Sequence, residues 1–206
     1  MKIKICGMRS PRNLEQVCTL WPDFVGFIFY PRSKRFVGTS PDPSLFQIPG
    51  PDIQKVGVFV NETLTDLLHC FETHQLQCVQ LHGEESPEYC RRLSEEGITV
   101  IKALDVRTAG ARLEEYRDQV SCYLFDTPGP GRGGTGHKFD WDLLKQVPAG
   151  FPFLLGGGIG PEDHGALLAL DHDGLRGVDV NSRFELSPGV KNVGELKKFM
   201  AKLKTA

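Results

Sequence analysis

Short apolar segments alternate with longer segments of helical periodicity along the whole chain. Apolar runs bounded by turn-forming residues are typical of buried strands, and the chain has them at Lys2–Cys6, Phe24–Phe29, Lys55–Val60, Cys78–Leu81, Thr99–Ala103, Cys122–Asp126, Phe153–Gly156 and Gly177–Val180. Apolar residues at helical spacing predict helices between these strands, at Pro11–Leu20, Glu62–Thr73, Pro87–Glu96, Ala111–Gln119, Trp141–Gln146, Pro161–Leu170 and Val193–Leu203. We therefore expect strands and helices to alternate throughout.

Residues at the ends of these segments refine the boundaries. Asn61 and Ser86 each precede a helical pattern and are typical N-cap residues. The connection after the second strand, Gly38–Pro51, contains prolines at 41, 43, 49 and 51. Proline disrupts the interior of a helix, so any helix in this connection is expected to be short.

The alternation predicts the fold class. Strands separated by helices favour a parallel sheet, and eight such units favour a closed (β/α)8 TIM barrel over an open sheet. We expect one compact barrel domain over residues 1–206, because this length supports one sizeable core. The alternative is a doubly wound open sheet. Gly156–Gly160 resembles a nucleotide-binding loop, but it lacks the Gly-x-Gly-x-x-Gly spacing and the later acidic residue of that motif.

Composition and charge limit the classes of molecule that the protein is expected to bind. The formal net charge is −2 with 24% charged residues, which gives no electrostatic basis for binding nucleic acid or an anionic membrane. No apolar run approaches the length of a membrane span, and the first residues lack the apolar core of a signal peptide. We therefore expect a cytoplasmic protein that binds neither nucleic acid nor membrane.

The six cysteines are expected to be free thiols, because none forms a Cys-x-x-Cys pair and no secretion signal precedes them. Cys70, His74 and Cys78 recur every four residues, as metal ligands on one helix face would. Cys78, however, begins a predicted strand. The spacing therefore does not favour a metal site.

A carboxyl group and a thiol are the first candidates for chemistry. Asp126 ends an apolar strand and precedes a glycine-rich segment, Gly129–Gly136. A carboxyl group in this position is consistent with a general acid or base, and equally with a residue that only caps a turn. Side chains alternate along a strand, so Lys4 and Cys6 share one face. If Cys6 and Asp126 both face inward, they meet at one cavity, and Lys4 one layer below favours the thiolate. The alternative for Cys6 is a small buried apolar residue.

The loops after the seventh and eighth strands predict an anion site. Barrels often bind phosphate with these two loops, through backbone N–H groups and helix N-termini. Gly157 and Gly158 allow close approach of the backbone, while Asn181, Ser182 and Arg183 add an amide, a hydroxyl and a cation. The alternative is that both loops are ordinary turns.

Other side chains near the strand ends extend the candidate site. The loop after the second strand is basic, with Arg32, Lys34 and Arg35, and one of these cations can hold a second anionic group. His82 can exchange hydrogen bonds with a ligand, and Asp179 can bind a sugar hydroxyl. A structural role remains the alternative for both.

In combination these residues resemble the phosphoribosylanthranilate isomerase family of tryptophan biosynthesis. The resemblance spans nearly the whole chain and depends on the order of its motifs: Lys4–Arg9, Gly26–Arg35, Val56–Asn61, Gln80–Gly83, Gly133–Gly136 with Phe139–Trp141, Gly157–Gly158 with Pro161–Glu162, and Gly177–Val180. It implies a barrel isomerase acting on a small phosphosugar, without metal or organic cofactor, as a monomer or homodimer.

The resemblance also implies roles for individual residues. Cys6 matches the family's general base, Asp126 its general acid, and Arg35 the residue that holds the anthranilate carboxylate. The chain departs from the family at Asn181, where a serine is common, and at Arg183, where a glycine is common. The alternatives are another phosphosugar isomerase barrel, such as the histidine-pathway enzyme, and a phosphate-binding barrel without turnover.

Overall fold

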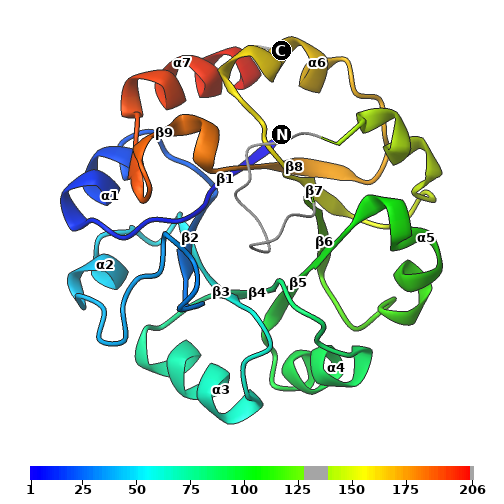
Figure 1. Cartoon of the computed structure of the whole chain (residues 1–206), viewed down its shortest axis with the longest axis horizontal. Coiled ribbons are helices and arrows are strands. Elements are labelled where there is room, and N and C mark those ends of the chain that lie inside the picture. Colours follow the sequence, from blue (N-terminus) through cyan, green and yellow to red (C-terminus); the bar gives the residue numbers. More distant parts are fainter. Residues whose placement is uncertain (128–138, 205–206) are drawn as a thin grey trace.

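Eight parallel strands close into a barrel in the computed structural model, which describes residues 1–127 and 139–204 (Figure 1). The strands are β1 (Lys2–Ile5), β2 (Phe24–Ile28), β3 (Gln54–Phe59), β4 (Cys78–Leu81), β5 (Thr99–Leu104), β6 (Cys122–Phe125), β7 (Phe153–Leu155) and β8 (Leu175–Val180). Because β1 pairs with both β2 and β8, the sheet has no free edge. The predicted TIM barrel is confirmed and the open sheet is excluded. The glycine-rich segment Gly129–Gly136 lies outside the described residues.

Helices surround the barrel as the sequence predicts. They are α1 (Pro11–Cys18), α2 (Ser44–Gln47), α3 (Leu64–Thr73), α4 (Pro87–Glu95), α5 (Val106–Glu115), the 3₁₀ helices η1 (Trp141–Gln146) and η2 (Pro161–Asp163), α6 (His164–Leu168) and α7 (Val193–Lys204). The helix in the proline-rich connection is short, as expected. Ser86 caps α4 by accepting from the Tyr89 N–H.

Two helix starts differ from the prediction. The fifth helix begins at Val106 rather than Ala111, because Asp105 accepts from the Arg107 N–H and caps it. The cap of α3 is Thr63, whose hydroxyl accepts from the Asp66 N–H. Asn61 instead adopts a left-handed backbone with φ 53°. Its side-chain oxygen accepts from the Glu84 N–H at 2.7 Å, so it shapes the loop before the helix.

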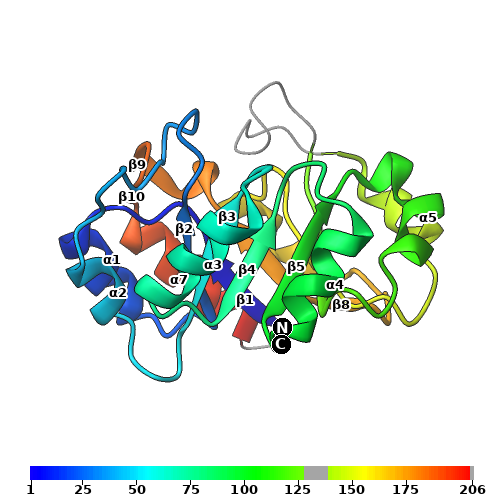
Figure 2. The ribbon, with the colours of Figure 1, turned by 90° about the horizontal axis from the view of Figure 1, so that it is seen from below.

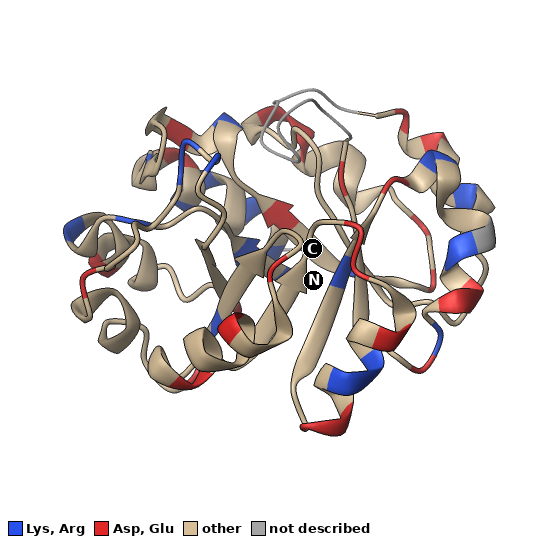
Figure 3. Cartoon of the chain, turned by 60° about the horizontal axis from the view of Figure 1, so that its bottom comes forward, with Lys and Arg blue, Asp and Glu red and all other residues tan. Residues whose placement is uncertain are grey.

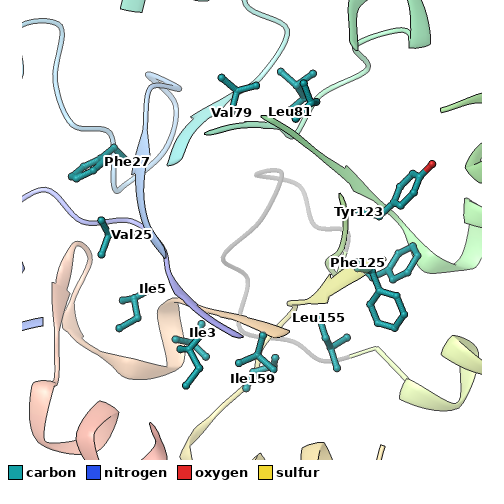
Figure 4. Close-up of a cluster of buried hydrophobic side chains, with 14 of the residues drawn as sticks. Ile3, Ile5, Val25, Phe27, Val79, Leu81, Tyr123, Phe125, Leu155 and Ile159 are labelled. Atoms are coloured by element: carbon teal, nitrogen blue, oxygen red, sulfur yellow. The ribbon is translucent and has the colours of Figure 1, made fainter. Parts of the chain in front are cut away.

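The largest apolar core lies between the barrel and the helices. Figure 4 shows side chains of this core pointing away from the barrel axis, among them Ile3, Ile5, Val25 and Phe27. A second cluster consists of residues that alternate with these and therefore face the barrel interior: Phe24, Val56, Cys78, Ile101, Ala103, Leu124 and Leu154. Since Lys4 and Cys6 alternate with Ile3 and Ile5, they also face inward.

A hairpin follows β8 that the sequence did not predict. The chain passes through a 3₁₀ turn, η3 (Ser182–Phe184), and then forms the antiparallel strands β9 (Glu185–Ser187) and β10 (Val190–Lys191). Gly189 in the turn has φ +85°, which glycine adopts without strain. Strands this short show no alternation of apolar residues. The hairpin brings Glu185 and Lys191 to the barrel mouth.

The side view in Figure 2 places the start of β1 and the last turn of α7 at one end of the barrel and the β9–β10 hairpin toward the other. Acidic and basic residues are spread over the outer helices and loops, while the strands carry few of them (Figure 3). Within residues 1–127 and 139–204, no helix is long and apolar enough to cross a membrane.

Candidate active site

A pocket opens at the carboxyl ends of the strands and collects most of the predicted site residues. Its lining includes residues that end or follow seven of the eight strands, all except β5: Cys6, Ile28, Tyr30, Ser33, Arg35, Val58, Val60, Gln80, His82, Asp126, Gly157, Gly158, Ile159, Asp179, Asn181 and Ser182. The thiol of Cys6 and the carboxyl of Asp126 thus face the same space, as the strand alternation predicts. This is the face on which barrel enzymes place their chemistry.

The thiol of Cys6 is buried beside charged groups. Gly26 of the neighbouring strand leaves room for it: a Cβ at Gly26 would lie 2.8 Å from Cys6 Sγ and 3.3 Å from Lys4 Nζ. The Lys4 ammonium, fully buried, donates to Asp179 Oδ1 at 3.0 Å. Burial alone would lower the pKa of Lys4, but the Asp179 carboxylate and the Cys6 thiolate reverse this and raise it. Lys4 is therefore a fixed cation beside the sulfur.

The pKa of Cys6 departs from the sequence expectation. Burial raises the pKa of the thiol, and this outweighs the ammonium of Lys4, which lowers it. We expected Lys4 to favour the thiolate. It does so only in part, because the free energy needed to remove a thiolate from water exceeds the stabilisation that one nearby cation provides.

On the opposite side of the pocket, Asp126 is held at both carboxylate oxygens. Oδ1 accepts from the Thr127 N–H at 2.8 Å, and Oδ2 lies 3.4 Å from His82 Nε2. Gln80 Nε2 lies 2.9 Å from His82 Nδ1. Because an amide nitrogen only donates, Nδ1 accepts this hydrogen bond and the ring proton lies on Nε2, toward Asp126. Sequence reasoning missed Gln80. Its position two residues before His82 on the same strand face was a signal that could have found it.

The backbone of the loop after β7 is shaped for close approach. Gly157 and Gly158 have φ +78° and +69°, which side-chain-bearing residues rarely adopt. A Cβ at Gly157 would lie 2.4 Å from Thr127 Oγ1 and 2.7 Å from Thr127 N. Asn181 and Ser182 follow the neighbouring strand β8 and also line the pocket. The two loops together offer backbone and side-chain donors of the kind that bind phosphate.

Arg183, unlike Asn181 and Ser182, is not among the residues that line the pocket. Its side chain is 45% exposed, and Nη2 donates to Glu162 Oε1 at 2.7 Å. The carboxylate of Glu162 thus holds the Arg183 guanidinium at the surface. In this arrangement Arg183 links the segments after β7 and β8.

Arg35 is the member of the basic loop that lines the pocket. Its Nε donates to both carboxylate oxygens of Glu185, at 2.9 and 3.0 Å, and its Nη2 donates to Glu185 Oε2 at 2.7 Å. Lys191 Nζ donates to Glu185 Oε1 and to Asn181 Oδ1, each at 2.7 Å. Sequence reasoning missed Glu185 and Lys191, because the hairpin that carries them was not predicted.

Metal ligands do not gather in the described part of the chain. Within residues 1–127 and 139–204, no three His, Cys, Asp or Glu side chains form a group that could hold a metal ion. Cys70 lies in α3, His74 caps that helix and Cys78 begins β4, so the regular spacing in sequence does not continue along one helix.

Comparison with known proteins agrees with this architecture. The family model described as N-(5'phosphoribosyl)anthranilate (PRA) isomerase matches residues 3–202. A protein of that name from Parabacteroides distasonis is 42% identical over 206 residues, covering 98% of this chain and 93% of its own.

Solved structures give the same result. The crystal structure of phosphoribosyl anthranilate isomerase from Thermus thermophilus superposes with TM-score 0.87 at 29% identity, covering 100% of this chain and 99% of that one. A second structure, of the isomerase in complex with reduced 1-(o-carboxyphenylamino)-1-deoxyribulose 5-phosphate, has TM-score 0.79 at 32% identity and covers both chains fully, 100% each. The chain belongs to the N-(5'-phosphoribosyl)anthranilate isomerase family.

Proposed function

We propose that this protein catalyses the Amadori rearrangement of N-(5'-phosphoribosyl)anthranilate to 1-(2-carboxyphenylamino)-1-deoxyribulose 5-phosphate, a step of tryptophan biosynthesis. One observation carries the proposal: a thiol and a carboxyl group line one pocket together with an arginine and a glycine-rich loop, in a chain of this family. The pocket therefore offers an acid, a base and two anion-binding ends, which match a substrate with a carboxylate at one end and a phosphate at the other.

In the proposed first step, Asp126 acts as the general acid. Its carboxyl proton passes to the furanose ring oxygen, and the bond between that oxygen and C1' breaks. The lone pair of the anthranilate nitrogen forms a double bond to C1', so the ring opens to an iminium. Asp126 is left as a carboxylate, which accepts hydrogen bonds from the Thr127 N–H and, in the matching tautomer, from His82.

In the second step, the Cys6 thiolate acts as the general base. It removes the proton from C2', and the electrons of the C2'–H bond form the C1'–C2' double bond while the iminium nitrogen becomes neutral. This gives the enol form of the aminoketose. It becomes the ketone product when C1' takes up a proton from water and the C2' hydroxyl loses one. The iminium acidifies the C2' proton, so the step needs no metal or organic cofactor. Asp126 and Cys6 regain their starting protonation states through solvent.

Binding of the two anionic ends completes the proposal. Arg35 holds the anthranilate carboxylate, because it is a cation that lines the same pocket as Cys6 and Asp126. The backbone at Gly157 and Gly158, with Asn181 and Ser182, binds the phosphate, and Asp179 accepts a hydrogen bond from a sugar hydroxyl. The protein acts as a monomer or a homodimer, which sedimentation equilibrium would test.

The test is turnover of the fluorescent substrate by the protein and by two variants. General acid and base groups typically contribute about 10²–10⁴-fold in rate, so Cys6→Ala and Asp126→Asn should each lower kcat by that factor with an unchanged circular dichroism spectrum. Near-normal turnover by folded Cys6→Ala would refute the mechanism. Turnover of the histidine-pathway aminoaldose instead, or tight binding without turnover, would favour one of the two other functions considered from the sequence.

A further inference from the structure

Three charged side chains form a buried ion cluster at the edge of the pocket. Arg35 follows β2, Glu185 begins β9 and Lys191 ends β10. Arg35 is 9% exposed and Lys191 1%, while the Glu185 side chain is 4% exposed. Charges are costly to bury unless they are paired, so a cluster of this kind needs a physical reason. Glu185 and Lys191 take no part in the mechanism above.

We propose that Glu185 and Lys191 are positioning residues that orient Arg35, and thereby give the pocket its preference for a carboxylated aromatic substrate. The inference rests on the proposed function, in which Arg35 binds the anthranilate carboxylate. It adds that Arg35 alone is insufficient: its guanidinium is useful only in the plane and position that Glu185 imposes.

The contacts of Arg35 define that plane. Glu185 engages Nε and one N–H of Nη2, which is the bidentate geometry that best fixes a guanidinium. Arginine has five N–H donors, and among residues 1–127 and 139–204 Nη1 has no hydrogen-bond acceptor. The edge formed by Nη1 and the second N–H of Nη2 can therefore bind a second carboxylate. Gly7 leaves room for the aliphatic part of the Arg35 side chain, because a Cβ at Gly7 would lie only 2.6 Å from Arg35 Cδ.

Lys191 holds Glu185 in turn. Its Nζ reaches both Glu185 Oε1 and Asn181 Oδ1 at 2.7 Å, and so ties the arginine end of the pocket to the proposed phosphate loop. The backbone of Lys191 is anchored to Asn13, whose Oδ1 accepts from the Lys191 N–H at 2.7 Å and whose Nδ2 donates to the Lys191 carbonyl at 3.0 Å. The hairpin therefore presents Glu185 from a rigid support.

Charge and orientation make opposite predictions for Glu185→Gln. This substitution removes a negative charge beside Arg35, so a role that is only electrostatic predicts stronger binding of an anionic ligand. A positioning role predicts weaker binding, because glutamine cannot accept two hydrogen bonds from the guanidinium on two equivalent charged oxygens. The direction of the change thus separates the two roles.

The experiment compares two stable ligands by calorimetry on the full chain. One is reduced 1-(o-carboxyphenylamino)-1-deoxyribulose 5-phosphate, and the other is the same compound without the carboxylate. The preference for the carboxylate is the dissociation constant of the ligand without the carboxylate divided by that of the ligand with it, called the carboxylate ratio below. Losing hydrogen bonds to a charged group predicts that Glu185→Gln lowers this ratio by about 10- to 100-fold. Glu185→Asp keeps the charge but shortens the side chain, and it should lower the ratio by a smaller factor.

Matched controls separate this role from a general loss of structure. Lys102 is another fully buried lysine, paired with Glu85 at 3.0 Å and bonded to the Gly83 carbonyl away from the Arg35 cluster. Lys191→Met and Lys102→Met should both lower the melting temperature, whereas only Lys191→Met should lower the carboxylate ratio. In an Arg35→Met background, Glu185→Gln should leave the ratio unchanged.

The outcomes distinguish the inference from the function on which it rests. If Arg35→Met leaves the ratio unchanged, Arg35 does not bind the carboxylate and that part of the proposed function fails. If Arg35→Met abolishes the preference while folded Glu185→Gln and Glu185→Asp keep it, only the positioning role is overturned. An increased ratio in Glu185→Gln would likewise overturn it, in favour of a purely electrostatic effect.

Discussion

Replacing Lys4 by methionine perturbs the base side of the pocket in two measurable ways. The substitution removes a fully buried ammonium that lies 3.0 Å from Asp179 Oδ1, and it leaves a carboxylate that is only 10% exposed without its partner. Removing one member of a buried pair typically costs about 3–5 kcal/mol. For a chain of this size that corresponds to a fall in melting temperature of about 6–20 °C. Adding Asp179→Asn should restore part of the loss, because no unpaired charge then remains.

The second effect concerns the thiol. Burial already raises the pKa of Cys6, and Lys4 is the first of the cations that oppose this rise, with Lys191 contributing less; the Asp179 carboxylate acts in the opposite direction. A thiol with a raised pKa forms more thiolate as the pH rises. Because the thiolate of Cys6 is the proposed base, kcat/KM of the unmodified protein should increase with pH above neutrality. Losing an adjacent cation raises the pKa of the thiol further. Lys4→Met should therefore move the rise of kcat/KM to higher pH.

The assay is the pH dependence of kcat/KM, followed by the loss of substrate fluorescence. Lys55→Met is the matched control, because Lys55 is also buried but its Nζ donates to the Phe46 carbonyl at 3.0 Å, in the helical shell outside the pocket. In this control, kcat/KM should rise at the same pH as in the unmodified protein. If kcat/KM of a folded Lys4→Met protein also rises at that pH, the reasoning is refuted, because Lys4 then has no effect on the ionisation of Cys6.

Three further predictions concern the loops and a helix cap. Gly157→Ala should raise KM at least about tenfold in steady-state kinetics and destabilise the protein by about 1–3 kcal/mol, because φ is +78° and the new Cβ would meet Thr127; an unchanged KM would contradict a phosphate role for this loop. Arg183→Gly should change stability by less than about 1 kcal/mol in urea unfolding, as exposed pairs do, and a large rise in KM would instead assign Arg183 to the phosphate. Thr63→Ala should cost about 1 kcal/mol in the same unfolding experiment, and no change would show that the α3 cap is not stabilising.

The barrel was predictable because its signals are local. Each strand is an apolar run, and the first-turn prolines at Pro11 and Pro87 begin α1 and α4 as expected. The start of α5 was not predicted, because its cap, Asp105, precedes a turn with few apolar residues. The β9–β10 hairpin escaped prediction for a related reason: its strands are held by partners far apart in sequence, such as Asn13 and Lys191.

The same distinction between local and long-range features applies to the site. Strand alternation placed Cys6 and Asp126 at one cavity, since both are fixed by the geometry of single strands. The direction of the Cys6 pKa shift was not predictable, because it depends on how much water reaches the sulfur after folding. The partner of Arg35 was not predictable either, because Glu185 lies 150 positions away in the sequence.

The most direct test of the account is a crystal structure of this protein with reduced 1-(o-carboxyphenylamino)-1-deoxyribulose 5-phosphate. The account predicts Cys6 Sγ within about 4 Å of C2', and an Asp126 oxygen within about 2.6–3.2 Å of the hydroxyl that derives from the ring oxygen. It also predicts the phosphate at Gly157 and Gly158. A ligand that contacts only one of the two groups, or that lies with its phosphate at Arg35, would contradict the account.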